Sequence, residues 1–171
     1  MNEVNERKVK YAFEEVFEEV SQLKTPEETI ALALDREKEA RVFYLERAAS
    51  SEDVKLIDLY THLADEEAKH IEYLEKYRKT KNLPAVKNPI SAVQSFVPEF
   101  PEKDNRFGPI AVLLAALRHE RKSEYFYSEM AKQAKEEPLK KFFELLAGYE
   151  RVHYELIDNY IEAITEFRMQ T

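Results

Sequence analysis

Apolar side chains recur every three or four residues along four long stretches of the chain, which is the period of an amphipathic α-helix. In the first half the stripes are Ile30, Leu34, Ala40, Tyr44, Ala48 and then Ile57, Tyr60, Ala64, Ile71, Leu74, Tyr77. In the second half they are Leu113, Leu117, Tyr127, Ala131 and then Phe142, Leu146, Ile157, Tyr160, Ile164. The pattern predicts an all-α protein with four long helices.

Helix-start and helix-stop signals divide these stretches into pairs. Thr25 caps the first helix, with Pro26 in the first helical position and Glu28 as the capping-box partner. Residues 50–53 read as a short turn with a new cap, so the first two helices form a hairpin over 25–81.

Four of the seven prolines and Gly108 fall within residues 82–108, and a fifth proline, Pro109, follows directly. Proline ends helices, so this stretch is predicted to be a linker, followed by a second hairpin over 109–168 that Pro138 divides. Residues 1–24 form a further amphipathic segment and are predicted to be an N-terminal helix.

The two hairpins repeat each other. A shift of 83 residues aligns 31–80 with 114–163 without a gap, and fourteen of the fifty pairs are identical. The identical pairs include Leu34/Leu117, Glu37/Glu120, Phe43/Phe126, Tyr44/Tyr127, Leu63/Leu146, Glu67/Glu150, His70/His153 and Tyr77/Tyr160. The repeat predicts two helix hairpins built to one plan.

Composition narrows the function classes. The 171 residues carry 34 acidic and 26 basic side chains, a formal net charge of −8, which argues against a nucleic-acid partner. The absence of cysteine excludes thiolate metal sites and thiol nucleophiles within this sequence. No apolar run is long enough for a membrane helix or a signal peptide, so we expect a cytoplasmic protein without membrane contact.

Six polar residues interrupt the apolar stripes: Glu37, Glu67, His70, Glu120, Glu150 and His153. Each Glu-x-x-His pair shares one helix face, because residues three apart on a helix point the same way. All six lie near the middle of their helices, so antiparallel packing would bring them to one level of the bundle.

A lone histidine on an apolar face is usually a hydrogen-bonded core residue, and most glutamates of such a chain cover solvated faces. Four close carboxylates in an apolar interior are different, because each uncompensated charge costs several kcal/mol. Two divalent cations would cancel the four charges. Carboxylates with imidazoles favour iron or manganese, with zinc as an alternative that lacks redox chemistry.

These segments resemble the ferritin-like superfamily, specifically its rubrerythrin-like branch. The resemblance rests on residues 37–44 and 120–127, on Glu67-Ala-Lys-His70 and on Glu150-Arg-Val-His153, with 30 residues from each first glutamate to the next in both halves. It implies a ferritin-like four-helix bundle with a long crossover, in which the second and third helices run parallel.

The resemblance also implies residue roles. Glu37 and His70 would be terminal ligands of one iron, Glu120 and His153 of the other, and Glu67 and Glu150 would bridge both. The implied activity is a peroxidase or ferroxidase that reduces hydrogen peroxide or dioxygen as Fe(II) is oxidised, in protection against oxidative stress.

The sequence departs from the family in two places. Full rubrerythrins carry a rubredoxin-like centre held by four cysteines, so this chain would need a separate electron donor such as a rubredoxin-like protein. They also have an extra glutamate where this chain has Ser123. Glu124, one place further, is expected to pair with an arginine or lysine on the helix flank, with metal ligation as the alternative.

Two other pairs of residues are interpreted without a role at the metals. Tyr44 and Tyr127 are expected to pack in the core with hydrogen-bonded hydroxyls, a redox role being the alternative. His62 and His119 lack repeat partners and are placed at the surface or behind the ligands.

Iron storage in a ferritin-like cage and a non-catalytic metal-binding scaffold remain alternative functions. The long tether could let hairpins exchange between two chains, which predicts a homodimer of the domain-swapped kind.

Overall fold

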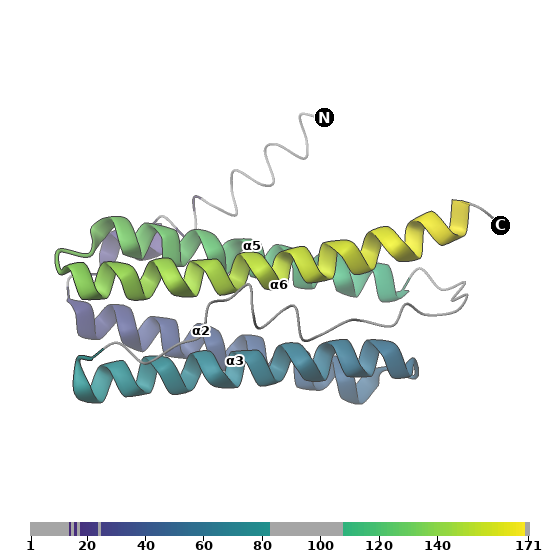
Figure 1. The fold of residues 1–171 in the computed structure, drawn as a ribbon, viewed down its shortest axis with the longest axis horizontal. Coiled ribbons are helices and arrows are strands. Elements are labelled where there is room, and N and C mark those ends of the chain that lie inside the picture. Colours follow the sequence, from purple (N-terminus) through teal and green to yellow (C-terminus); the bar gives the residue numbers. More distant parts are fainter. Residues whose placement is uncertain (1–13, 15, 17, 24, 83–107, 170–171) are drawn as a thin grey trace.

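The computed structural model is a bundle of long helices lying side by side (Figure 1). It describes residues 14, 16, 18–23, 25–82 and 108–169, and these form helices and short turns without any strand. Among these residues no helix has the length and apolarity that a membrane crossing requires. The predicted all-α, ferritin-like four-helix arrangement is confirmed.

The first hairpin consists of α2 (Pro26–Ser50) and α3 (Val54–Thr80). Thr25 caps α2: its hydroxyl accepts from the Glu28 N–H at 3.1 Å, and the Glu28 carboxylate accepts from the Thr25 N–H at 3.1 Å. Asp53 caps α3 by accepting from the N–H groups of Lys55 and Leu56. These side chains satisfy donors that the first turn of a helix leaves open, and so they fix where each helix begins.

The second hairpin consists of α5 (Gly108–Gln133) and α6 (Glu137–Met169). Residues 134–136 form the turn between the two helices, and Pro138 falls in the first turn of α6, where its missing N–H costs no hydrogen bond. Close backbone packing occurs mainly within each hairpin, with a smaller contact between α2 and α5.

The helix directions require a long connection. In Figure 1, α3 ends at the same end of the bundle as the α5–α6 turn, whereas α5 begins at the opposite end, beside the α2–α3 turn. Helices α3 and α5 therefore run parallel, as the resemblance implied. The predicted linker, 82–108, lies almost entirely outside the described residues.

Two apolar clusters fill the bundle, one toward each end. The first includes Ile30, Leu74, Phe126, Phe142 and Leu146, and the second includes Leu59, Leu63, Leu113, Ile157 and Tyr160. Side chains of all four helices contribute to each cluster. Polar groups occupy the middle of the bundle, between the two apolar clusters.

Part of the predicted N-terminal helix is described. Residues 18–22 are helical, and the side chains of Val16 and Val20 are buried in the first apolar cluster. Arg36 of α2 forms an ion pair with Glu19 of this segment. The rest of the predicted 1–24 helix lies outside the described residues.

Candidate metal centre

All six residues predicted as ligands meet in the middle of the bundle. Helix α2 supplies Glu37, α3 supplies Glu67 and His70, α5 supplies Glu120, and α6 supplies Glu150 and His153. Each of these residues is at most 2% exposed. They come together because every helix places its polar interruption at the same level, between the two apolar clusters.

The six residues form two overlapping groups. The donor atoms of Glu37, Glu67, His70 and Glu150 lie within 4.8 Å of one another, and so do those of Glu67, Glu120, Glu150 and His153. The two groups therefore share Glu67 and Glu150, which come from the two Glu-x-x-His segments. Each group also has one glutamate and one histidine of its own.

Three carboxylates surround one nitrogen of His70. Its Nδ1 lies 3.1 Å from Glu37 Oε2, 3.0 Å from Glu67 Oε2 and 3.2 Å from Glu150 Oε1. A neutral imidazole with a proton on Nδ1 can donate to only one of them, and without that proton its lone pair would face three acceptors.

In the other half, two carboxylates lie close to one nitrogen of His153. Its Nδ1 lies 3.5 Å from Glu67 Oε1 and 3.3 Å from Glu120 Oε2. Glu67 thus turns one oxygen toward each histidine. The two imidazole rings are nearly parallel, with centroids 5.3 Å apart.

Several buried atoms at this level have no hydrogen-bond partner among the described residues. They are Glu67 Oε1, Glu120 Oε2, Glu150 Oε1 and His153 Nδ1, together with His70 Nε2. Leaving buried acceptors unpaired costs about 1–3 kcal/mol each. The four atoms named first all belong to the convergent groups, so a pair of cations there would satisfy them. The donor set, carboxylates with imidazoles and no thiolate, fits iron or manganese.

Without cations, the cluster lowers its charge by holding protons. Burial and the nearby Glu67 charge raise the pKa of Glu37 to about 8, and the same two causes raise the pKa of Glu150 well above its usual value. Burial opposes a charged His70, but the Glu37 charge raises its pKa well above the ordinary value. A metal ion entering this site must therefore displace protons.

Glu67 behaves in the opposite way. Burial alone would raise its pKa, but the imidazoles of His153 and His70, which face its two oxygens, outweigh burial and hold the pKa of this carboxyl well below the ordinary value. Burial also works against a charged His153, whose pKa is nevertheless raised by the nearby carboxylates of Glu120 and Glu67. Glu67, at the centre of the cluster, thus stays ionised.

Two tyrosines connect the hairpins behind the cluster. The Tyr44 hydroxyl of α2 donates to Glu120 Oε1 on α5, and the Tyr127 hydroxyl of α5 donates to Glu37 Oε1 on α2. The predicted core position with a hydrogen-bonded hydroxyl agrees with these contacts. Sequence reasoning missed that each tyrosine reaches the glutamate of the other hairpin, although the retained pair Tyr44/Tyr127 was a signal for it.

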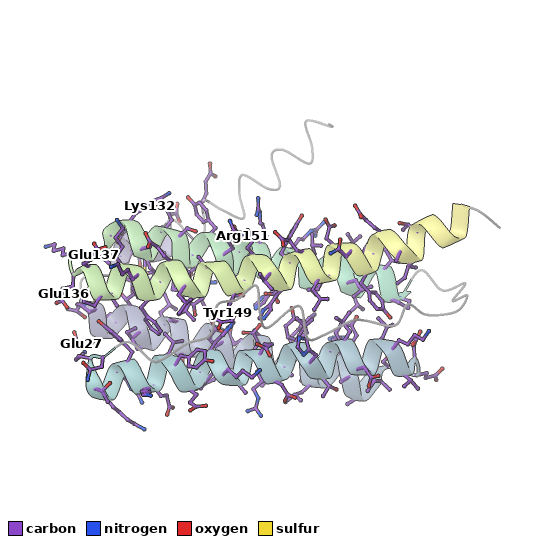
Figure 2. All side chains as sticks on the ribbon, viewed as in Figure 1. Glu27, Lys132, Glu136, Glu137, Tyr149 and Arg151 are labelled. Carbon is purple, nitrogen blue, oxygen red and sulfur yellow. The ribbon has the colours of Figure 1, made fainter. Side chains whose placement is uncertain are left out.

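Tyr149 is a neighbour of the cluster that the sequence did not reveal. It lies between α6 and α3, midway along the bundle (Figure 2). Its ring centroid is 5.1 Å from that of His70 and 6.4 Å from that of Tyr73. Its repeat partner is Glu66, so the 83-residue comparison gave no hint of this role.

The remaining polar candidates lie outside both ligand groups. Glu124 pairs with Arg121 at 2.6 Å, as expected, and Ser123 is buried. His119 is partly buried and stacks on Phe43 with centroids 6.3 Å apart. His62 is also partly buried, and burial lowers its pKa.

Comparison with known proteins finds a family match in the second hairpin. The sequence model of the Rubrerythrin family matches residues 111–168, about a third of the chain, which covers most of α5 and α6. No curated protein sequence and no solved structure matches significantly. The match confirms the resemblance to a ferritin-like di-iron family, and the 83-residue repeat carries the same ligand pattern into the first hairpin.

Proposed function

We propose that this rubrerythrin-like bundle is a di-iron oxidoreductase that reduces hydrogen peroxide, or dioxygen, as Fe(II) is oxidised. The observation that carries the proposal is the sharing of Glu67 and Glu150 between two ligand groups. A single metal would need only one group. Two groups with two common carboxylates are what a pair of adjacent metals requires.

In this proposal each residue has one position. Glu37 and His70 hold one iron, Glu120 and His153 hold the other, and Glu67 and Glu150 bridge them. The orientation of Glu67, with Oε2 near His70 and Oε1 near His153, supports a bridging role. Manganese or zinc could take the same ligands, but zinc would give no redox activity.

The chain prepares the site in three ways. The four carboxylates supply the negative charge that balances two divalent cations. Tyr44 and Tyr127 fix the orientation of Glu120 and Glu37 by donating to the oxygens that face away from the ring nitrogens. The apolar clusters on both sides exclude bulk water from the metals.

Bound as a pair of Fe(II) ions, the metal would supply the two electrons that, together with two protons, reduce hydrogen peroxide to two water molecules without releasing a radical. The electrons must then be replaced. Because these 171 residues contain no cysteine, the reductant is proposed to be a separate protein of the rubredoxin-like class. The physiological role would be protection of the cytoplasm against oxidants.

The test is anaerobic loading with Fe(II) followed by hydrogen peroxide. We expect two irons per chain and rapid oxidation of both by one equivalent of peroxide, followed by optical spectroscopy in a stopped-flow instrument. Slow or substoichiometric oxidation of bound iron would overturn the oxidoreductase proposal and favour a metal-binding scaffold.

A variant lacking a shared ligand provides the first control. Glu150→Gln keeps the side-chain volume but removes the carboxylate, and it should abolish the fast phase. Glu124→Gln changes a carboxylate outside both ligand groups and should retain the fast phase. Continued iron uptake far beyond two per chain, with particles much larger than a dimer, would favour ferritin-like storage instead.

We also propose a homodimer, with exchange of hairpins between the two chains as its form. The proposal is supported by the opposite positions of the α3 end and the α5 start, which demand a long connection. A monomeric mass in sedimentation equilibrium at micromolar concentration would rule out the dimer.

A further inference from the structure

The 83-residue repeat relates two cavities at opposite ends of the bundle. One lies at the α2–α3 turn beside the start of α5, and has a volume of about 310 Å³. The other lies at the α5–α6 turn beside the start of α2, and has a volume of about 220 Å³. We call them the α2–α3 pocket and the α5–α6 pocket.

Ten lining positions of the two pockets correspond one to one. The pairs, with the α2–α3 pocket first, are Arg47/Met130, Ser50/Gln133, Ser51/Ala134, Glu52/Lys135, Asp53/Glu136, Leu56/Leu139, Tyr60/Phe143, Gly108/Thr25, Pro109/Pro26 and Val112/Thr29. The α5–α6 pocket has one more lining residue, Leu23 from the N-terminal segment. Among the described residues, the α2–α3 pocket has no counterpart of it.

Tyr60 is the first difference that points to a ligand. The residue is 2% exposed, and its hydroxyl has no hydrogen-bond partner among the described residues. Its ring stacks on Tyr44 at 6.3 Å, just as Phe143 stacks on Tyr127 at 6.2 Å in the other half. Phe143 shows that packing at this position does not require a hydroxyl, so packing alone does not explain why Tyr60 carries one.

Arg47 is the second difference. It stands where the other half has the buried Met130, and its guanidinium lies over the Phe43 ring at 5.2 Å. Its Nε is buried and has no hydrogen-bond partner within the part of the chain that the structure describes. Burial raises the pKa of Tyr60 to about 12 against the opposing Arg47 charge, so both groups offer protons at neutral pH.

The other polar side chains of the pocket have interactions of their own, and these are Ser50, Ser51, Glu52 and Asp53. Ser50 donates to the Arg47 carbonyl at 3.3 Å, the Asp53 N–H donates to Ser51 Oγ at 3.3 Å, and Asp53 Oδ1 caps α3. Among the described side chains of the pocket, the polar atoms without a partner are the Nε–H of Arg47 and the Tyr60 hydroxyl, and α5 begins at the pocket with Gly108. A helix begins with unsatisfied N–H groups and a partial positive charge, so all three favour an anion.

We propose that the α2–α3 pocket binds a small oxyanion, with Arg47 and Tyr60 as its donors and the start of α5 as a third contact. Leu56, Val112 and Pro109 supply apolar walls, which favours an organic carboxylate over an inorganic ion. The volume matches a ligand at the small end of the range for such sites.

The test is calorimetric titration of the full chain with sodium benzoate and, separately, with inorganic phosphate, at constant ionic strength. We expect saturable binding that weakens about tenfold or more in Tyr60→Phe and in Arg47→Gln, because each change removes a donor to a charged ligand. Tighter binding of benzoate would identify an organic acid as the source of the oxyanion, and tighter binding of phosphate an inorganic one. Either order supports the site.

The repeat supplies the controls. Tyr60→Phe creates the residue found at Phe143, so it should fold and melt at the same or a higher temperature without ligand. Phe143→Tyr places a hydroxyl in the α5–α6 pocket, which has no arginine at position 130, and should leave benzoate affinity unchanged. Absence of saturable binding of both probes would overturn the proposal, and so would equal affinities in the wild type, Tyr60→Phe and Arg47→Gln.

Discussion

The middle of this bundle and its ends treat the internal repeat differently. In the middle, Glu37/Glu120, Glu67/Glu150, His70/His153 and Tyr44/Tyr127 are identical pairs, and each side chain contacts the same kind of partner as its mate. At the ends, Arg47 replaces Met130 and Tyr60 replaces Phe143 within pockets lined by corresponding positions. The residues of the two halves are identical in the middle, where four buried carboxylates need cations to balance their charge. They differ at the ends, where each pocket can bind a different ligand.

The largest expected effect comes from removing a shared ligand. Glu67→Gln should lose both metals together, because both groups depend on Glu67, whereas Glu37→Gln should mainly weaken the site near His70. Metal analysis after equilibrium dialysis measures the difference. Two metals per chain in Glu67→Gln would contradict the bridging assignment and reduce the centre to two independent sites.

The second effect is a pH dependence of folding stability that comes from the middle of the bundle. In the metal-stripped protein the pKa of Glu37 is raised from 4.5 to about 8, so between these values the folded chain holds a proton that the unfolded chain has released. Stability should therefore fall as pH rises through this window, by about 1.4 kcal/mol per pH unit for this group. The raised pKa values of Glu150, His70 and His153 act in the same direction.

Urea unfolding at several pH values measures this slope. Glu37→Gln should flatten it, and saturating metal should reverse it, because metal replaces the protons. A metal-stripped protein whose stability rises steadily from pH 5 to pH 8 would show that the cluster does not store protons.

The third effect tests whether the hydrogen bonds between the two hairpins orient the metal ligands. Tyr44→Phe removes the donor to Glu120, and Tyr127→Phe removes the donor to Glu37. Each should weaken the binding of one metal by about 10–100-fold, which is the usual effect of losing a group that orients a ligand. Tyr77→Phe, a buried tyrosine of the first apolar cluster, is the matched control and should leave metal affinity unchanged. Equal metal binding in all three variants would mean that the cross-hairpin bonds do not orient the ligands.

Much of this centre could be predicted from sequence because the repeat and the helical period act together. Glu37 and Glu120 stand out as charges on apolar stripes, and the i, i+3 spacing of Glu67 with His70 fixes their common face. The contacts that cross between hairpins could not be predicted. The partner of Tyr44 and the position of Tyr149 beside His70 depend on how α2 and α3 pack against α5 and α6, and that packing has no local signal.

The pocket at the α2–α3 turn was missed for a related reason. Arg47 and Tyr60 each look like ordinary helix residues, and only the correspondence with Met130 and Phe143 shows that the end of the bundle gained polar groups. The correspondence appears only when the residues that line each cavity are known.

The smallest expected effect concerns Glu124. Its carboxylate pairs with Arg121 on an exposed face, and the repeat places Arg41 at the matching position. Glu124→Gln should change stability by no more than about 0.5 kcal/mol and leave the metal content at two, as urea unfolding and metal analysis would show. Loss of a metal in this variant would add Glu124 to the ligand set.

Anomalous X-ray diffraction from crystals loaded with Fe(II) under anaerobic conditions tests the central claim most directly. The account predicts two iron peaks about 3.5–4 Å apart, one beside Glu37 and His70 and the other beside Glu120 and His153, with Glu67 and Glu150 between them. A single peak, or peaks away from these six side chains, would contradict it.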